Sequence, residues 1–443
     1  MFTTRQGQVK RLHILLAAGA YAGVLLWVYA AVLSPIFSYE GYTLAWPGPA
    51  TMLWLLLLAL APAVALPRSL SRPSAFIVWW LYLAVYIPSI LVPALSLSLS
   101  WEKLLPLHLS LLLSMGLLCL ACSARLLAMG QVKLSPTVFW STFALIWLAG
   151  LAFAYAKSSV VANIGSVLRG ATEYGIRSQV YQIVTGGNRV LGYVLGELGQ
   201  ALNPFLIAVG ILRRRGLYLA AGIIGQVIVF GVTGFKTVVL SALFLPLAFL
   251  LIRRWRSNFG LAFTSGVIVI MLVCVIVDRA SGNILFSSLF TRRTLAGPGL
   301  LTGFYFEHFS QVSHAGIAYH LHRDASVIDA SREIGLVYFG SSNVDANANL
   351  WAEGFADLGV LGVLGFTFIA GLMIWLYDSV ARRRNLELAV LLAVMPAVAL
   401  SNSAPTTVLI THGGLAAAIL LYLVPLAPAE AAEVEERHAP ASD

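Results

Sequence analysis

The chain has 443 residues, of which 59% are hydrophobic and 11% charged, and its mean hydropathy is +0.86. A soluble domain does not need so much apolar surface, so this composition excludes an ordinary soluble enzyme and predicts a polytopic membrane protein. The net charge of +9 needs no nucleic-acid partner, because basic loops beside a membrane and its lipid headgroups account for it.

Apolar stretches follow one another along most of the chain. A membrane-spanning helix needs about 20 apolar residues, since the hydrocarbon layer is about 30 Å thick and every backbone amide inside it must be bonded within the helix. We therefore expect an all-α membrane protein with about twelve spans, at residues 12–34, 48–66, 75–97, 105–122, 137–155, 190–211, 217–232, 236–252, 259–277, 356–377, 387–402 and 407–426.

Basic residues alternate between these spans in a regular way. Six clusters would lie on one side of the membrane: Arg5/Lys10/Arg11, Arg68/Arg72, Arg125/Lys133, Arg213/Arg214/Arg215, Arg253/Arg254/Arg256 and Arg382/Arg383/Arg384. The positive-inside rule places that side, and both termini, in the cytoplasm. The sequence thus predicts one transmembrane domain over residues 1–428, with large external loops at about 156–189 and 278–355, and an acidic disordered cytoplasmic tail at 429–443.

The three cysteines lie within predicted spans. Cys119 and Cys122 form a CxxC pair in the fourth span, and Cys274 lies in the ninth. A redox or metal-binding CxxC needs an exposed thiolate, so we interpret all three as small buried apolar residues. No cofactor is expected.

The first external segment is basic, which is unusual outside the membrane. It contains Lys157, Arg169, Arg177 and Arg189 against the single carboxylate of Glu173. On a helix, residues 169, 173 and 177 would share one stripe, and two guanidiniums braced by a carboxylate could bind a phosphate or pyrophosphate. An intrahelical salt-bridge ladder is the equally weighted alternative.

The second external segment concentrates the titratable groups. It holds five arginines and four of the eight histidines, and Glu307 stands next to His308. A histidine oriented by a carboxylate is the usual general base for activating a hydroxyl. Two alternatives remain open: a metal site at His314, His320 and His322, and purely structural histidines in a folded loop.

Residues 347–366, "NANLWAEGFADLGVLGVLGF", lead from this segment into the tenth span. Asn347 or Asn349 would cap the helix, Trp351 would anchor its end at the interface, and the glycines would permit close helix packing. Carboxylates at the membrane boundary are expensive unless they face a polar cavity. Glu353 and Asp357 therefore predict such a cavity at the outer mouth of the bundle.

The pattern Ala-Asn-Leu-Trp-Ala-Glu-Gly-Phe-Ala-Asp-Leu-Gly at 348–359 resembles a segment of bacterial Wzy-type O-antigen polymerases. "VTGFKTVVL" at 232–240 is similar to a Gly-Ser/Phe-Lys/Arg segment at a tight external turn of that family. The layout of many helices with two dominant periplasmic loops is also similar, although seven carboxylates in the second loop depart from a plainly basic one. The resemblance implies a GT-C-like, metal-independent glycosyltransferase that extends a glycan on undecaprenyl pyrophosphate.

The resemblance also implies roles for particular residues. Cations would stabilise the pyrophosphate leaving group, and we assign Arg169, Arg177, Arg189, Lys236 and Arg292 or Arg293 to this task. The acceptor hydroxyl needs a base, which we expect among His308, His314, Glu307 and Glu353, with His308 favoured. Asn349, Trp351 and Glu353 would line the glycan site. The expected partners are the lipid-linked oligosaccharide, membrane lipids and a chain-length regulator.

Two further hypotheses stay open. An O-antigen ligase has a similar layout and the same donor, but transfers the chain to lipid A core. A lipid-linked oligosaccharide flippase or transporter would place charges along a path inside the helices, where Glu197 is one of few ionisable groups. The large external loops favour an enzyme.

Overall fold

The structure is a computed structural model that describes residues 10–97, 99–130, 132, 134–157, 189–312 and 329–426. The side chains of Arg189 and Lys236 are not described. Within these ranges the chain is helical and contains no β-strand. The all-α fold class is therefore confirmed.

The first half of the chain forms helices that are interrupted by short π or 3-10 turns, labelled η. The elements are α1 Arg11–Val28, η1 Tyr29–Leu33, α2 Ser34–Phe37, η2 Ser38–Glu40, α3 Pro49–Leu60, η3 Ala61–Val64, α4 Pro73–Leu81, η4 Tyr82–Tyr86, α5 Ile87–Ser96, α6 Trp101–Ser123 and α7 Pro136–Lys157. The continuous helix α4–η4–α5 forms the centre of the molecule, since 94% of the residues in its apolar 18-residue stretch are buried. Only 17% of the corresponding stretch of α7 is buried.

The middle of the chain adds α10 Arg189–Glu197, η6 Leu198–Leu202, α11 Asn203–Leu212, α12 Gly216–Thr233, α13 Lys236–Trp255, η7 Arg256–Asn258 and α14 Phe259–Ser281. The last part contains α15 Leu285–Ser287, η8 Ser288–Ala296, α16 Gly297–Phe309, α18 Ala330–Phe339, α19 Leu350–Ala381, α20 Leu386–Leu400, α21 Pro405–Thr411 and α22 Gly414–Leu423.

Eight helical stretches in the described residues are long and apolar enough to cross a membrane, or nine if the bent pair α21 and α22 counts as one span. The protein is thus a multi-pass membrane protein. The stretch 237–281 counts once although it contains α13, η7 and α14, and two further expected spans coincide with apolar helices that are shorter, at Pro49–Val64 and Leu386–Leu400.

The described part of the segment expected as a second external loop, 278–312 and 329–355, is largely helical. It contains α15, η8, α16 and α18, and α16 packs against α5 and α19. Nine of the thirteen residues of α16 are buried. The apolar residues of α16, which were too few to predict a span, bury this helix against the central helix.

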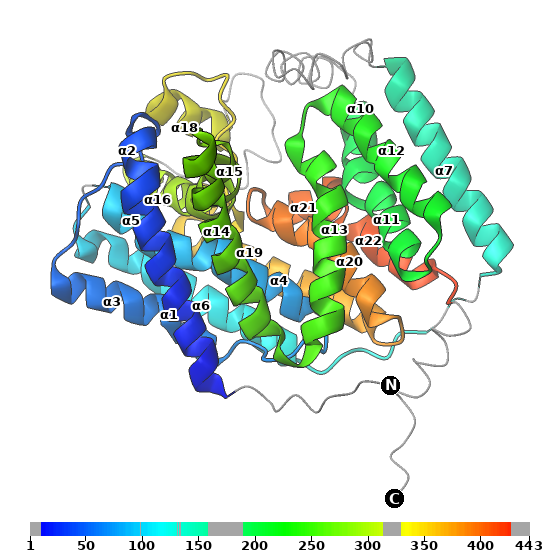
Figure 1. Cartoon of the computed structure of the whole chain (residues 1–443), viewed down its shortest axis with the longest axis horizontal. Coiled ribbons are helices and arrows are strands. Elements are labelled where there is room, and N and C mark those ends of the chain that lie inside the picture. The colour runs from blue at the N-terminus through cyan, green and yellow to red at the C-terminus, as the bar shows by residue number, and fades with distance from the viewer. Residues whose placement is uncertain are drawn as a thin grey trace, which may run out of the picture.

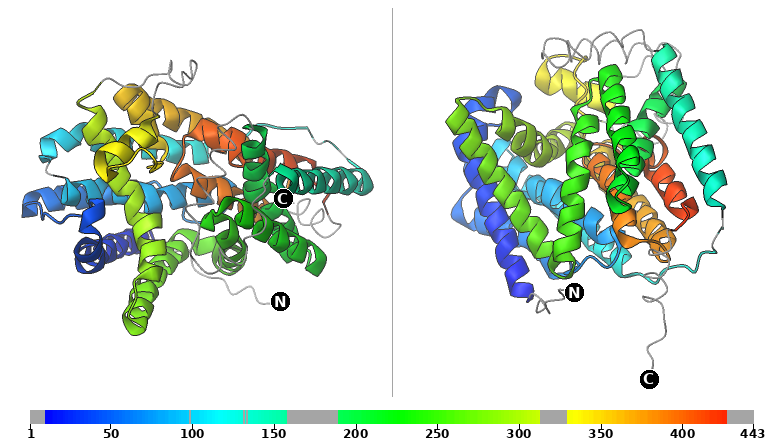
Figure 2. Two further views of the ribbon diagram at one scale, coloured as in Figure 1. Left: turned by 90° about the horizontal axis from the view of Figure 1, so that it is seen from above. Right: turned by 45° about the vertical axis from the view of Figure 1, so that its right-hand side comes forward.

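The two ends of the molecule differ in composition. Helices α1, α13 and α14 run between a lower and an upper end in Figure 1, and the α13–α14 turn with its arginines lies at the lower end, while α18 lies at the upper end. The right-hand view of Figure 2 shows the same arrangement. Several lower-end arginines donate to carbonyls near helix ends: Arg72 to Cys122 O and Ala124 O (2.9 and 2.8 Å), Arg213 to Pro425 O (2.7 Å) and Arg384 to Val424 O (3.0 Å). Basic side chains at this end therefore cap the C-terminal ends of helices, in addition to indicating the orientation in the membrane.

Helix α19 contains a sharp break near its start. Leu358 has φ −141° and ψ 22°, and Gly359 has φ 61° and ψ −142°, a conformation that is essentially restricted to glycine. Gly354 lies directly against Gly362, and Trp351 Nε1 donates to Thr367 Oγ1 at 3.0 Å. In a straight helix those two pairs would be about 12 Å and about 24 Å apart along the axis. The chain therefore folds back at Gly359, and residues 350–357 pack against the helix that follows.

The three cysteines are free and buried, as expected. The tight turn expected near Lys236 is also confirmed: α12 ends at Thr233, Gly234 adopts φ 64°, and α13 begins at Lys236.

Candidate active site

Three helix boundaries bring a set of titratable side chains together at the upper end of the molecule. The C-terminal turns of α16 face α18 and the start of α19. Asp329 caps α18 by accepting from Arg332 N at 2.9 Å, and Asn349 caps α19 by accepting from Trp351 N at 3.0 Å. Both caps satisfy backbone N–H groups that a helix start leaves without partners.

His308 is paired with a carboxylate that is distant in the sequence. Its Nε2 lies 2.6 Å from Glu333 Oε1, with 15% of the His308 side chain and 37% of the Glu333 side chain exposed. Nδ1 has no hydrogen-bond partner among the described residues. If Nε2 carries the proton toward Glu333, Nδ1 presents a lone pair, which is the arrangement that a general base needs.

Glu307, the carboxylate expected to orient His308, has a different partner. Tyr338 Oη donates to Glu307 Oε2 at 2.8 Å, and the Tyr338 ring stacks on Phe304 with centroids 4.0 Å apart. Consecutive residues on an α-helix point about 100° apart, so Glu307 and His308 cannot share one partner face. Pairing Glu307 with His308 was therefore wrong. Burial and the bond to Glu307 raise the pKa of Tyr338, so its hydroxyl stays a donor at neutral pH.

Glu353 is in contact with Tyr305, one helical turn before His308. Tyr305 Oη lies 3.1 Å from Ala346 O and 3.4 Å from Glu353 Oε1. Burial raises the pKa of Tyr305 well above its usual value, and the nearby carboxylates of Glu353, Asp329 and Asp345 add to the effect. Residues three apart on a helix are neighbours, so Glu353 and the His308–Glu333 pair approach adjacent turns of α16.

Arg332, which precedes Glu333 on α18, contacts two carboxylates. Its Nε lies 3.3 Å from Asp345 Oδ1 and 3.9 Å from Asp329 Oδ2. The sequence patterns predicted no role for Arg332, Glu333, Tyr305 or Tyr338. The spacing of Tyr305 and His308 on one helix face could have indicated Tyr305, but the partners on α18 have no local signal.

Asn349 is confirmed as a helix cap and has additional packing contacts. Its side chain is buried, and Nδ2 donates to Thr302 Oγ1 at 2.7 Å and to Pro298 O at 3.1 Å. Thr302 in turn lies 2.9 Å from Ser89 Oγ. This chain of hydrogen bonds joins α19 to α16 and α5, so Asn349 fixes the start of α19 relative to these two helices. A contact between Asn349 and a glycan remains a prediction.

Trp351 does not anchor the helix at a membrane interface, and that interpretation was wrong. The side chain is fully buried, its Nε1 donates to Thr367, and its ring meets Tyr86 edge-on with centroids 6.3 Å apart. The fold-back at Gly359 explains the difference, because it encloses the indole between two helices.

Arg292 and Arg293 lie on η8. Arg292 is 8% exposed, forms an ion pair with Glu40, donates to Ser288 Oγ at 2.9 and 3.1 Å and stacks 4.2 Å from the Phe37 ring. Its guanidinium thus joins η8 to η2 and α2. Arg293 is exposed.

The remaining expected residues are not covered. Arg169, Arg177 and His314 lie outside the described residues, as do His320 and His322 of the alternative metal site, and the side chains of Arg189 and Lys236 are not described. In the part of the chain that is described, no group of three or more His, Cys, Asp or Glu side chains is placed to hold a metal ion.

Comparison with protein-family models, curated protein sequences and solved structures finds no match to this chain. The fold defines the class, a multi-pass helical membrane protein with a His–carboxylate pair at one end.

Proposed function

We propose that the chain is a glycosyltransferase that polymerises lipid-linked oligosaccharide repeat units at the outer face of a bacterial inner membrane. One observation carries the proposal: Glu333 holds His308 through Nε2, and Nδ1 has no partner among the described residues, next to Tyr305 and Glu353 and at the end opposite the arginine-rich turns. The resemblance of residues 348–359 and 232–240 to Wzy-type polymerases supports the same reaction class.

The proposed reaction needs one base and a site for the leaving group. The acceptor sugar hydroxyl attacks the anomeric carbon of the growing glycan, its proton passes to His308 Nδ1, and the bond from the anomeric carbon to undecaprenyl pyrophosphate breaks with its electron pair on the pyrophosphate. Glu333 fixes the ring and stabilises the imidazolium that forms. Glu353 is proposed to accept from a sugar hydroxyl, and the buried Tyr305, which donates to Ala346 O and lies 3.4 Å from Glu353 Oε1, is proposed to fix its position.

Cations are proposed to stabilise the pyrophosphate as negative charge builds on it. Arg169, Arg177, Arg189, Lys236 and Arg293 remain assigned to this task. Arg292 is removed from the assignment, because its ion pair with Glu40 and its bonds to Ser288 occupy the guanidinium.

The proposed membrane arrangement keeps the twelve spans and a GT-C-like architecture. The twelve expected stretches each coincide with helix in the described residues, and six basic clusters on one side agree with an even number of crossings. The large segments around 158–188 and 278–355 then face the periplasm. A chain-length regulator is the proposed protein partner.

The test is the pattern of surface polysaccharide in a host lacking this gene, complemented with the wild type, His308→Ala or Glu333→Gln at matched membrane levels. The proposal expects a ladder with the wild type and lipid A core capped by a single repeat unit with His308→Ala. An unchanged ladder after deletion would overturn the proposal for this glycan.

Two other outcomes would replace the proposed activity with another. Uncapped core together with long polymer on undecaprenyl pyrophosphate would make the protein a ligase. Repeat units retained on the cytoplasmic leaflet would make it a flippase.

A further inference from the structure

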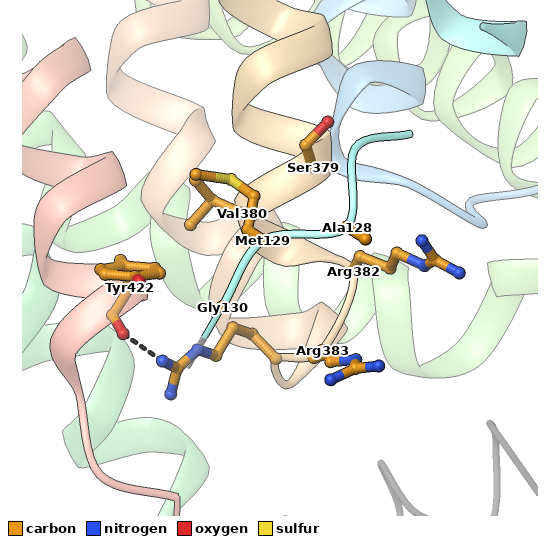
Figure 3. A pocket seen from close by; sticks show the side chains of 9 residues that line it. Ala128, Met129, Gly130, Ser379, Val380, Arg382, Arg383 and Tyr422 are labelled. Atoms are coloured by element: carbon orange, nitrogen blue, oxygen red, sulfur yellow. Dashed lines mark hydrogen bonds between the residues drawn. The ribbon is translucent and has the colours of Figure 1, made fainter. Parts of the chain in front are cut away.

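A small hollow lies at the lower end of the molecule, remote from His308. Loop residues 128–130, the C-terminal end of α19, the α19–α20 turn and Tyr422 near the end of α22 enclose it. Figure 3 shows the loop crossing one side, with Ser379 and Val380 above and the arginines of the turn below. This is the end where the basic turns gather.

Hydrogen bonds fix the walls of this hollow. Leu127 N donates to Ser379 Oγ at 3.2 Å, and Trp375 Nε1 donates to Arg125 O at 2.9 Å, so the loop is tied to α19 at two points. Arg384 donates to Val424 O at 3.0 Å and to Tyr422 O, which ties the turn to the end of α22. The hollow is therefore built from three anchored segments.

The three arginines at the hollow differ in their contacts with the described residues. Arg384 is 6% exposed and satisfies the last carbonyls of α22. Arg382 and Arg383 are exposed, and neither has a hydrogen-bond or ion-pair partner in the described part of the chain. Their side chains extend from the turn in Figure 3.

None of the nine described residues that line the hollow is Asp or Glu. The nearest carboxylate along α19, Asp378, is buried and accepts from Ser74 N at 2.9 Å and Ser74 Oγ at 2.6 Å. Two adjacent guanidiniums with no counter-charge among these lining residues favour an anion with several oxygens, because each can donate two N–H groups to it.

The other walls are apolar. Met129, Val380 and the Tyr422 ring line the hollow, which sits at the C-terminal ends of the apolar helices α19 and α22. We propose that it binds the phosphate headgroup of an anionic phospholipid, with Arg382 and Arg383 holding the phosphate and the glycerol end of the lipid against Met129 and Val380. Basic recesses between membrane helices on the cytoplasmic side suit such headgroups. This proposal does not depend on the proposed glycosyl transfer.

Arg253 and Arg254 provide a matched comparison. They are also adjacent, exposed and at the lower end, but their guanidiniums lie 5.8 Å from the Phe249 and Trp255 rings, and they do not line the hollow. Removing either pair changes the net charge equally. A difference between the two pairs therefore reports on the hollow and not on charge.

The test is native mass spectrometry of the full chain in detergent, titrated with phosphatidylglycerol or phosphatidylcholine. We expect phosphatidylglycerol to bind the wild type, and its affinity to fall about tenfold or more in Arg382→Gln/Arg383→Gln, since two charge-assisted bonds are lost. Arg253→Gln/Arg254→Gln should keep wild-type binding. Arg382→Lys/Arg383→Lys, which keeps both charges, should retain part of it and controls for a folding defect.

Each contrary result overturns the assignment. Equal binding in the wild type and the Arg382→Gln/Arg383→Gln variant would exclude these arginines. An equal loss in the Arg253→Gln/Arg254→Gln variant would reduce the effect to overall charge. Displacement of the lipid by millimolar inorganic phosphate would assign the hollow to a soluble phosphate and not to a membrane lipid.

Discussion

An imidazole that holds a carboxylate at one nitrogen keeps the other for proton transfer, and His308 has this arrangement with Glu333. More than a third of the Glu333 side chain is exposed, and ion pairs of that kind contribute about 0–1 kcal/mol to stability. The His308–Glu333 pair therefore contributes little to the stability of the fold. Its more important effect is to fix the orientation of the His308 ring.

Replacing Glu333 by Gln should lower glycosyl transfer without unfolding the protein, because the ring loses its charged partner. We expect kcat to fall about 10-fold or more with KM nearly unchanged, and His308→Ala to cost about 10²–10⁴-fold. The assay is transfer between synthetic lipid-linked oligosaccharides in detergent.

Glu307→Gln is the control for this prediction, since Glu307 bonds Tyr338 instead of His308. Its activity should stay near the wild type. If Glu307→Gln lost as much activity as Glu333→Gln, the assigned pairing would be incorrect.

Removing the hydrogen bond between Tyr338 and Glu307 should lower the stability of the protein rather than its activity. Tyr338→Phe leaves the Glu307 carboxylate without its donor, which costs about 1–3 kcal/mol, so the melting temperature in detergent should fall. Because burial raises the pKa of Tyr338 in the folded state, this stabilisation is complete below the unfolded pKa of about 10 and declines as the pH rises above it. The gap in melting temperature between wild type and variant should narrow from pH 7.5 to pH 10.5. A gap that widens would contradict the assignment.

At the scale of elements, the fold-back in α19 positions the candidate site. It places residues 350–357, with Glu353, against α16, and it encloses Trp351 against Thr367. Gly359 makes the turn, and the contact of Gly354 with Gly362 leaves no room for a side chain. The "WAEGFADLG" pattern therefore has a structural explanation for its Trp and for both of its glycines, independent of any substrate.

Gly359→Ala should destabilise the protein by about 1–3 kcal/mol, because φ 61° with ψ −142° is a strained conformation for any residue with a Cβ. Gly365→Ala is the matched control: it lies in the same helix with open space around its Cβ position, so it should be neutral or stabilising by up to about 1 kcal/mol. Thermal unfolding followed by circular dichroism measures both. Equal melting temperatures for the two variants would argue against the fold-back.

At the scale of the whole molecule, charge and titratable groups separate to opposite ends. Arginines that close helix ends gather at the lower end, and His308, Glu333 and Glu353 lie toward α18 at the upper end. The topology that we propose from the positive-inside rule has the lower end in the cytoplasm and the candidate site facing outward, where the proposed reaction takes place.

Cysteine labelling tests this orientation. The three native cysteines are buried, so a membrane-impermeant maleimide should react with Ser342→Cys, between α18 and α19, in intact spheroplasts. Ser257→Cys, in the α13–α14 turn, should react after permeabilisation only. The reverse pattern would invert the topology and remove the candidate site from the periplasm.

The sequence by itself determined those features that depend on neighbouring residues: the helical class, the apolar stretches, the basic turns, the cap at Asn349, the tight turn before Lys236 and the burial of the cysteines. Hydrophobicity over about 20 residues and a cap that reaches two or three residues ahead are local quantities. They can be read without knowing the fold.

Only the tertiary structure decided which groups meet. The sequence separation is 25 residues between His308 and Glu333, 47 residues between Asn349 and Thr302, and 252 residues between Arg292 and Glu40. In the structure Trp351 and Arg292 pack inside the protein, whereas the sequence indicated an interface anchor for Trp351 and a phosphate ligand for Arg292. The physical reason is that such pairings follow from how α16, α18 and the folded-back start of α19 pack together, and that packing is set by the whole apolar core rather than by the residues beside each partner.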